Sequence, residues 1–377
     1  MRQLQYFKDH RKPTWLELFF DLVLVAIVQV ITHNLSHTHH GDLTLDQMIQ
    51  FPVEFLPIWW VWATHTLYAN WFDTDSKSYR LATLAIMFLL FSMSSFLGDN
   101  LFERYYLFII FYFSIRMILA AFFFSSINKI EDSKEHTRAI AYITILGAII
   151  SASSVFFAST NIRELILISG ILFEMIAIIF VRNKFFMLPI HKEHFVERVG
   201  LLSIILLGES ILVMTQSINT VDWNATSVFA AITGFIMIGA IWWIYFDSFE
   251  VLPRLKSLTN GFVLLYSHFF LASGLVILAS LIRLTVLSDI NMHDFQILAI
   301  VGMCSFYFGK QLIYYISLPV FRVNIIINSL ACITITVLST FLPKPEYALF
   351  GMTVGMLFYT YANKKWATGK DVSDLLE

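Results

Sequence analysis

Apolar residues in this chain occur in long runs, with short polar segments between them. A run of about 18 or more apolar residues is long enough to cross the ~30 Å hydrocarbon layer of a bilayer as a helix. The pattern predicts an all-α polytopic membrane protein of about twelve transmembrane helices. Their expected ranges are 15–33, 51–72, 81–98, 104–126, 139–158, 163–181, 197–217, 226–248, 260–284, 294–318, 323–341 and 346–363.

Composition and charge agree with a chain embedded in lipid. Hydrophobic residues make up 58% of the 377 residues and charged residues 14%, whereas soluble domains carry about 25% charged residues. The formal net charge of −2 argues against nucleic acid as a partner, so the lipid bilayer is the expected partner.

Lysine and arginine indicate the orientation. With a cytoplasmic N-terminus, 19 of the 25 basic residues fall in cytoplasmic segments, 3 lie outside and 3 lie within spans. Cytoplasmic loops of membrane proteins are enriched in these residues, so both termini are predicted to be cytoplasmic.

Three short patterns recur in the second half of the chain. Phe72-Asp73 with Arg80 matches Phe246-Asp247 with Arg254, Phe111-Tyr112-Phe113 matches Phe306-Tyr307-Phe308, and Asn183-Lys184 matches Asn363-Lys364. They predict two six-helix repeats, residues 1–190 and 191–377, in parallel orientation because six is even. The repeated aspartate and arginine are expected to form an ion pair that stabilises a turn, or a gating latch.

Four charged residues are expected near the bilayer midplane: Arg116, Glu174, Glu209 and Lys310. Ionisable residues there are costly and are expected to have a partner. Their charges sum to zero, which suits fixed interhelical pairs and equally a relay of exchangeable pairs. Glu209 is the residue on which activity is expected to depend, with Arg116, Lys310 and His268 as candidate partners.

A second group of charges lies toward the cytoplasmic helix ends. Arg198 precedes Glu209 by eleven residues, so both lie on one helix face, roughly 16 Å apart. Asp21, Glu197 and Arg198 are predicted to line a cytoplasmic-facing vestibule. Glu17 and Asp21 are four residues apart and could form a cytoplasmic-side cation or proton site, but Glu17 is better explained as part of a helix cap with Thr14.

No signature of an enzyme is present: the sequence lacks a Walker loop, a glycine-rich dinucleotide turn and a His-Glu-x-x-His motif. We therefore expect no enzymatic activity and no cofactor. The histidines of the loop 34–50 (His37, His39 and His40) could bind a transition metal, but a polar loop is the simpler interpretation, and no metal site is assigned.

The chain resembles the bacterial low temperature requirement protein A family. The residues that carry this resemblance are Trp15-Leu-Glu17-Leu-Phe-Phe-Asp21, Trp62-Ala-Thr64, Asn70-x-Phe72-Asp73-Thr-Asp75, Arg80, His194-Phe-x-Glu197-Arg198-x-Gly200 and Leu207-Gly208-Glu209-Ser210. The resemblance implies a protein of the bacterial cytoplasmic membrane that supports growth in the cold. A fainter similarity in architecture, through Phe19-Phe20-Asp21, is to potassium channels built from six-helix repeats, although Phe20 replaces their serine.

The sequence thus favours a transporter or channel for a small ion or solute that uses intramembrane charged residues. The alternative is a non-transporting membrane scaffold, sensor or lipid-interacting factor needed in the cold.

The distribution of basic residues generates a labelling test. A single cysteine at Thr220 should react with an impermeant thiol reagent added outside the cell, because the residue is predicted to be external. A single cysteine at Ser257 should be protected until the membrane is opened. Both are made in a background lacking Cys304 and Cys332. External labelling at Ser257 would overturn the orientation.

Overall fold

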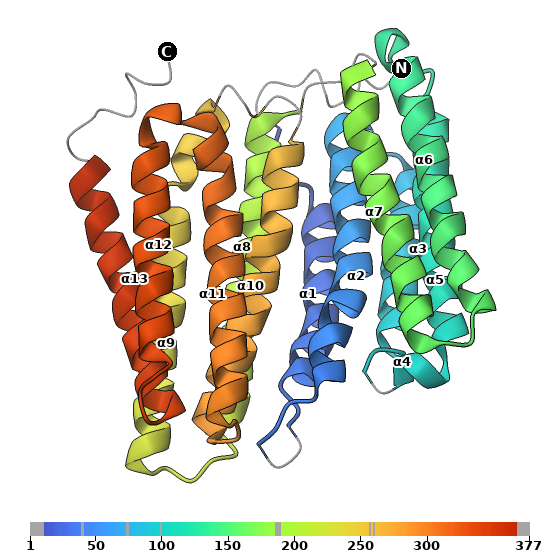
Figure 1. Cartoon of the computed structure of the whole chain (residues 1–377). Helices are drawn as coiled ribbons and strands as arrows, with labels where there is room; N and C mark the ends of the chain where they lie inside the picture. Colours follow the sequence, from blue (N-terminus) through green and yellow to red (C-terminus); the bar gives the residue numbers. More distant parts are fainter. Residues whose placement is uncertain are drawn as a thin grey trace. The chain divides into compact units, whose positions relative to one another are not determined.

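The computed structural model describes residues 11–38, 41–72, 75–98, 100–184, 190–255, 258 and 261–367, which form helices and no β-strand (Figure 1). The α-helices are α1 (Trp15–Leu35), α2 (Leu45–Phe72), α3 (Lys77–Ser94), α4 (Asn100–Glu103), α5 (Tyr105–Ser126), α6 (Lys134–Ser153), α7 (Thr160–Lys184), α8 (Lys192–Ile218), α9 (Ala225–Phe246), α10 (Phe262–Leu287), α11 (Met292–Ser317), α12 (Arg322–Ser339) and α13 (Pro345–Ala367). The predicted residues His39, His40, Asp73 and Ser257 lie outside the described part of the chain.

Several helices begin at side-chain caps that the local sequence supplies. The Oγ of Ser76 accepts a hydrogen bond from the Tyr79 N–H at 3.2 Å, and the Oδ1 of Asn291 accepts one from the Asp294 N–H at 2.8 Å. Each cap satisfies a first-turn amide that has no partner inside its helix. At the other end of α10, Ser288 adopts a left-handed conformation (φ 53°) that stops the helix.

Packing divides the chain into two compact units. The first comprises residues up to Ile31 together with Ile49–Arg198, and the second comprises Thr32–Met48 together with the residues from Val199 onward. In the first unit, α2 is the most enclosed element, because every residue from Val53 to Phe72 is buried. Helix α5 packs against α3 and α6, and α6 packs against α7.

The second unit is built around α10, in which every residue from Leu271 to Ile282 is buried. Helix α10 packs against α11 and α9, while α13 packs against α9 and α12. Contact between α10 and α11 is close because glycines face the opposite backbone. A Cβ on Gly274 would lie 2.6 Å from the Phe306 nitrogen, and one on Gly309 would lie 2.6 Å from the Ser267 carbonyl oxygen.

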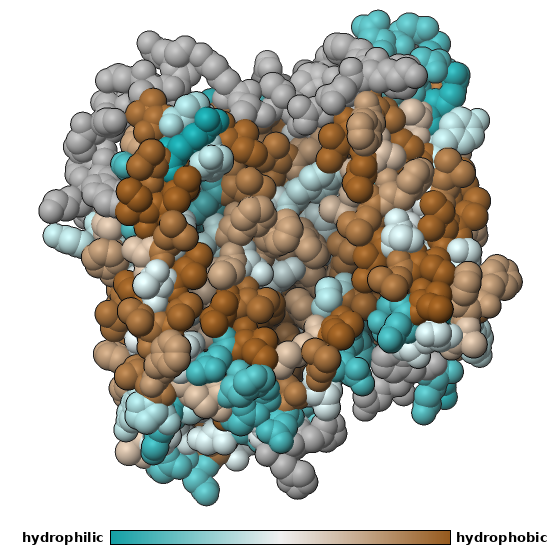
Figure 2. Space-filling model, viewed as in Figure 1, coloured by the Kyte–Doolittle hydropathy of each residue, from teal (hydrophilic) through white to brown (hydrophobic). Residues whose placement is uncertain are grey.

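Within the described residues, nine helices are long and apolar enough to cross a membrane. The three other long helices, α2, α3 and α13, carry more polar sequence. Helix α2 contains Glu54, His65 and Asn70, which would be costly in lipid but are buried inside the protein. Figure 2 shows hydrophobic residues along the middle of the visible helices and hydrophilic residues toward their ends.

The close contact at Gly309 predicts a large effect from one methyl group. Gly309→Ala should destabilise the protein by about 1–3 kcal/mol, because overpacking forces the two backbones apart. Gly239→Ala is the matched control, since a Cβ there meets nothing within 4 Å. Thermal unfolding in detergent measures both; equal melting temperatures would contradict the packing described here.

Candidate functional site

A hydrogen-bonded cap starts α1. The N–H and the hydroxyl of Thr14 donate to Oε2 of Glu17 at 2.7 and 2.9 Å, and the Glu17 N–H donates back to the Thr14 hydroxyl oxygen at 3.3 Å. This reciprocal arrangement is a capping box, which confirms the cap predicted from the sequence. It uses only one carboxylate oxygen, so Oε1 is free to bond residues from elsewhere in the first unit.

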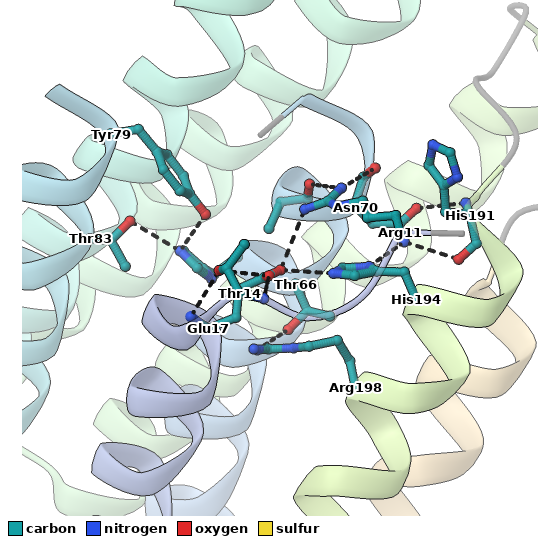
Figure 3. Close-up of polar contacts among 12 residues, drawn as sticks. Arg11, Thr14, Glu17, Thr66, Asn70, Tyr79, Thr83, His191, His194 and Arg198 are labelled. Carbon is teal, nitrogen blue, oxygen red and sulfur yellow. Dashed lines mark hydrogen bonds and ion pairs between the residues drawn. The ribbon is translucent and has the colours of Figure 1, made fainter. Parts of the chain in front are cut away.

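The second oxygen of Glu17 joins α1 to α8. The Nε2 of His194 lies 3.1 Å from Oε1, and the Arg11 guanidinium lies 3.6 Å from the same atom (Figure 3). Arg11 also donates to the carbonyl oxygens of Ala69 and Asn70 at 2.7 and 3.0 Å. One guanidinium therefore satisfies both a carboxylate and the last turn of α2.

Asn70 binds the start of α8 through both ends of its amide. Its Oδ1 accepts from the His191 N–H at 3.0 Å, and its Nδ2 donates to the His191 carbonyl oxygen at 3.2 Å. The Nδ2 group also donates to Nδ1 of His194 at 2.9 Å. Because Nδ1 accepts, the ring proton is on Nε2, where it is donated to Glu17, and the imidazole is neutral.

The next charged pair lies one turn deeper. Arg198 donates to Oδ1 of Asp21 at 2.8 Å, and the indole N–H of Trp62 donates to the same oxygen at 2.7 Å. Arg198 also donates to the hydroxyl of Thr66 at 3.3 Å. Both charged side chains are 0% exposed. Since a buried ion is tolerated only when it is paired and hydrogen-bonded, this pair ties α1, α2 and α8 together.

The vestibule stays a prediction, although the structure brings two of its three residues together. Asp21 and Arg198 form an ion pair in which both side chains are buried. Glu197 is half-buried and belongs to a different environment, where Lys12 attracts it electrostatically. Adjacent residues of a helix point about 100° apart, so Glu197 and Arg198 do not share a face.

A second buried ion pair in the first unit joins α5 to α7. Arg116 donates to Oε2 of Glu174 and, at 2.7 Å, to the hydroxyl of Thr64. The Trp60 indole N–H also donates to Oε2, at 3.1 Å. This pairing corrects the expectation that Arg116 partners Glu209, because the guanidinium is already bound to a carboxylate within its own unit.

His65 on α2 and His268 on α10 are both hydrogen-bonded. Nε2 of His65 lies 3.3 Å from the hydroxyls of Thr83 and Tyr79, and its ring stacks on Phe20 at 4.4 Å. Nδ1 of His268 donates to the Leu264 carbonyl oxygen at 2.7 Å, and its Nε2 accepts from the Tyr245 hydroxyl at 2.9 Å. Both ring nitrogens of His268 are thus occupied, so it does not partner Glu209 as predicted.

Lys310 also has other neighbours than Glu209. Its ammonium lies 4.9 Å from the centre of the Tyr314 ring and 5.6 Å from that of Tyr359, within cation–π range. The carboxylate of Asp247 attracts it electrostatically, and no ion pair within 4 Å is formed in the described chain. The prediction that Lys310 neutralises Glu209 is therefore wrong for this structure.

Glu209 is left without a charged partner among the described residues. Its side chain lies in the middle of α8 and is 4% exposed, and its Oε1 has no hydrogen-bond partner there. The neighbouring Gly208 is exposed, and a Cβ built on it meets nothing within 4 Å. A proton or cation must therefore accompany this carboxylate if it remains in an apolar surrounding.

The repeated turn pairs are described only in part. Arg80 makes a bidentate pair with Asp75, at 2.7 and 2.6 Å, and its predicted partner Asp73 lies outside the described residues. Arg80 and Asp75 are exposed, so this pair contributes only about 0–1 kcal/mol. Asp247 and Arg254 are not joined by a hydrogen bond or ion pair in the described chain, because Asp247 caps α9 while Arg254 ends a separate short helix.

The part of the chain that the structure describes holds nine apolar helices of membrane length, and charged side chains pair between helices. These features define a polytopic integral membrane protein. The chain belongs to the bacterial low temperature requirement A protein (LtrA) family, whose model matches residues 12–360. It is also similar to RA0937, an uncharacterized protein of Rhizobium meliloti (strain 1021). The two are 24% identical over 295 residues, which cover 72% of this chain and 69% of RA0937.

The contrast between the buried and exposed pairs generates a prediction. Arg198→Met should destabilise the protein by about 3–5 kcal/mol, because Asp21 would be left buried without its charged partner. The double variant, Arg198→Met with Asp21→Asn, should recover part of the lost stability. The control, Arg80→Met at the exposed pair, should change stability by less than about 1 kcal/mol.

Thermal unfolding in detergent, arranged as a double-mutant cycle, gives the coupling between the two residues. Additive losses from Arg198→Met and Asp21→Asn would show that the pair does not hold the helices together.

Proposed function

We propose that this protein is a transporter or channel for a small ion or solute, and that Glu209 is the group that binds and releases a proton or cation during transport. The observation that carries this proposal is a buried carboxyl in the middle of a membrane helix without a basic partner in the described chain. A fixed structural acid would be expected to have a partner. A carboxyl that exchanges a proton or cation must instead lie where a small cation can bind and leave.

The cluster of charged residues around Arg198 supports a closed state of the proposed transporter. Arg198 and Glu209 share one face of α8, roughly 16 Å apart. Around Arg198, two carboxylates and two guanidiniums balance, and all four side chains are buried. We propose that breaking and re-forming this cluster is the gating step of the transporter.

The architecture that we propose is two parallel six-helix repeats, residues 1–190 and 191–377, with twelve crossings that include α2, α3 and α13. The packing inside the two units supports this. Helix α5 packs on α3 and α6, and α6 on α7; likewise α11 packs on α10 and α12, and α12 on α13. We place the protein in the bacterial cytoplasmic membrane with both termini inside, and we propose that it is not an enzyme.

One observation favours the alternative, a non-transporting scaffold, sensor or lipid-interacting factor. Arg116 and Glu174, like Asp21 and Arg198, form closed pairs with additional hydrogen bonds from side chains of α2. Such pairs hold helices together whether or not anything is transported.

Glu209→Gln tests the proposal, because it keeps the shape and the hydrogen-bonding capacity while removing the charge. The purified variant should insert and unfold like the wild type but lose most of the ion or proton flux in liposomes. Glu135→Gln makes the same chemical change at an exposed position on α6 and should retain the flux.

Two outcomes would reject the proposal. Full flux through the Glu209→Gln variant would show that the carboxyl takes no part in transport. A variant that fails to insert or unfolds early, together with no flux in the wild type, would assign Glu209 to holding the bundle and favour the scaffold.

A further inference from the structure

A groove between α9 and α13 is not used by the proposed transport site. Its volume is about 590 Å³, within the range of sites that hold a small ligand. The two helices pack against each other in the second unit (Figure 1). On α9 the lining residues Ile236, Gly239, Trp243 and Asp247 recur every three or four positions, so they lie on one face.

The residues that line the groove are apolar at one end and aromatic or acidic at the other. Part of its lining is apolar, formed by Ile236, Gly239 and Leu357, and a Cβ on Gly239 would meet nothing within 4 Å. Its other end carries Trp243, Asp247 and Tyr361, of which Trp243 is 55% and Tyr361 65% exposed. Tryptophan and tyrosine concentrate where a membrane protein meets the lipid headgroups.

Both signs of charge meet at this polar end. Asp247 is exposed at the end of α9, and it attracts the buried ammonium of Lys310 on α11 without a direct ion pair. Because it is exposed, the carboxylate can be reached by a second cation. A ligand that suits this place has an apolar chain, an ammonium group and a compensating negative group.

We propose that the groove is a binding site for a phospholipid with a zwitterionic, ammonium-bearing headgroup. One acyl chain lies along Gly239, the headgroup lies among Trp243 and Tyr361, and Asp247 binds the ammonium. An anionic phospholipid without an ammonium would be repelled by the exposed carboxylate. The groove does not include Glu209, so the lipid site and the proposed transport can be tested separately.

The test uses the full chain, purified and equilibrated with equal amounts of phosphatidylethanolamine and phosphatidylglycerol. Native mass spectrometry then measures which lipid remains bound. The wild type should retain phosphatidylethanolamine preferentially. Asp247→Asn should lose this preference, whereas Asp222→Asn, the same change at an exposed loop residue, should keep it.

A second variant tests the apolar part. Gly239→Leu fills the groove and should reduce the retention of both lipids while the protein unfolds at the wild-type temperature. Equal retention of the two lipids by the wild type, or an unchanged preference in Asp247→Asn, would overturn the proposal. It would also be wrong if Gly239→Leu converts a dimer to a monomer without changing lipid retention, because a second copy would then occupy the groove.

Discussion

The high free energy of an unpaired charge in a low-dielectric medium is the constraint on which this structure depends. In the first unit, Asp21 with Arg198 and Glu174 with Arg116 meet it by pairing between helices that are far apart in sequence. Each pair also forms hydrogen bonds with α2 side chains: Trp60 and Trp62 donate to the carboxylates, and Thr64 accepts from Arg116. The positions of α1, α5, α7 and the first two turns of α8 around α2 are therefore set by charge as well as by shape.

Helix α2 explains why a polar sequence can lie inside the first unit of a membrane protein. Its tryptophans bury large apolar surfaces, yet each indole N–H of Trp60 and Trp62 serves a carboxylate on another helix. A helix with this composition is poorly suited to contact lipid. Enclosed by its neighbours, it provides the donors that the acidic residues of α1 and α7 require.

Local sequence was sufficient to predict the helices and the cap formed by Thr14 and Glu17, because both depend on residues close together in the chain. The partners of the charged residues were not predictable in this way. Arg116 was expected near Glu209 from depth alone, but which helices are neighbours decides the pairing, and a single sequence does not contain that information. Asn70 and Arg11 escaped notice because neither side chain has a partner nearby in sequence; the family motif includes Asn70 but does not assign its role.

The side-chain amide of Asn70 offers one hydrogen-bond acceptor and one donor. A neighbouring β-strand offers the same two groups through its backbone. The amide matches the N–H and the carbonyl of a single residue, His191. A shift of α8 by one residue would break both bonds at once and separate His194 from the same amide. The first turn of α8 therefore has a defined register against α2, and it can change position only by a discrete step, not by gradual sliding.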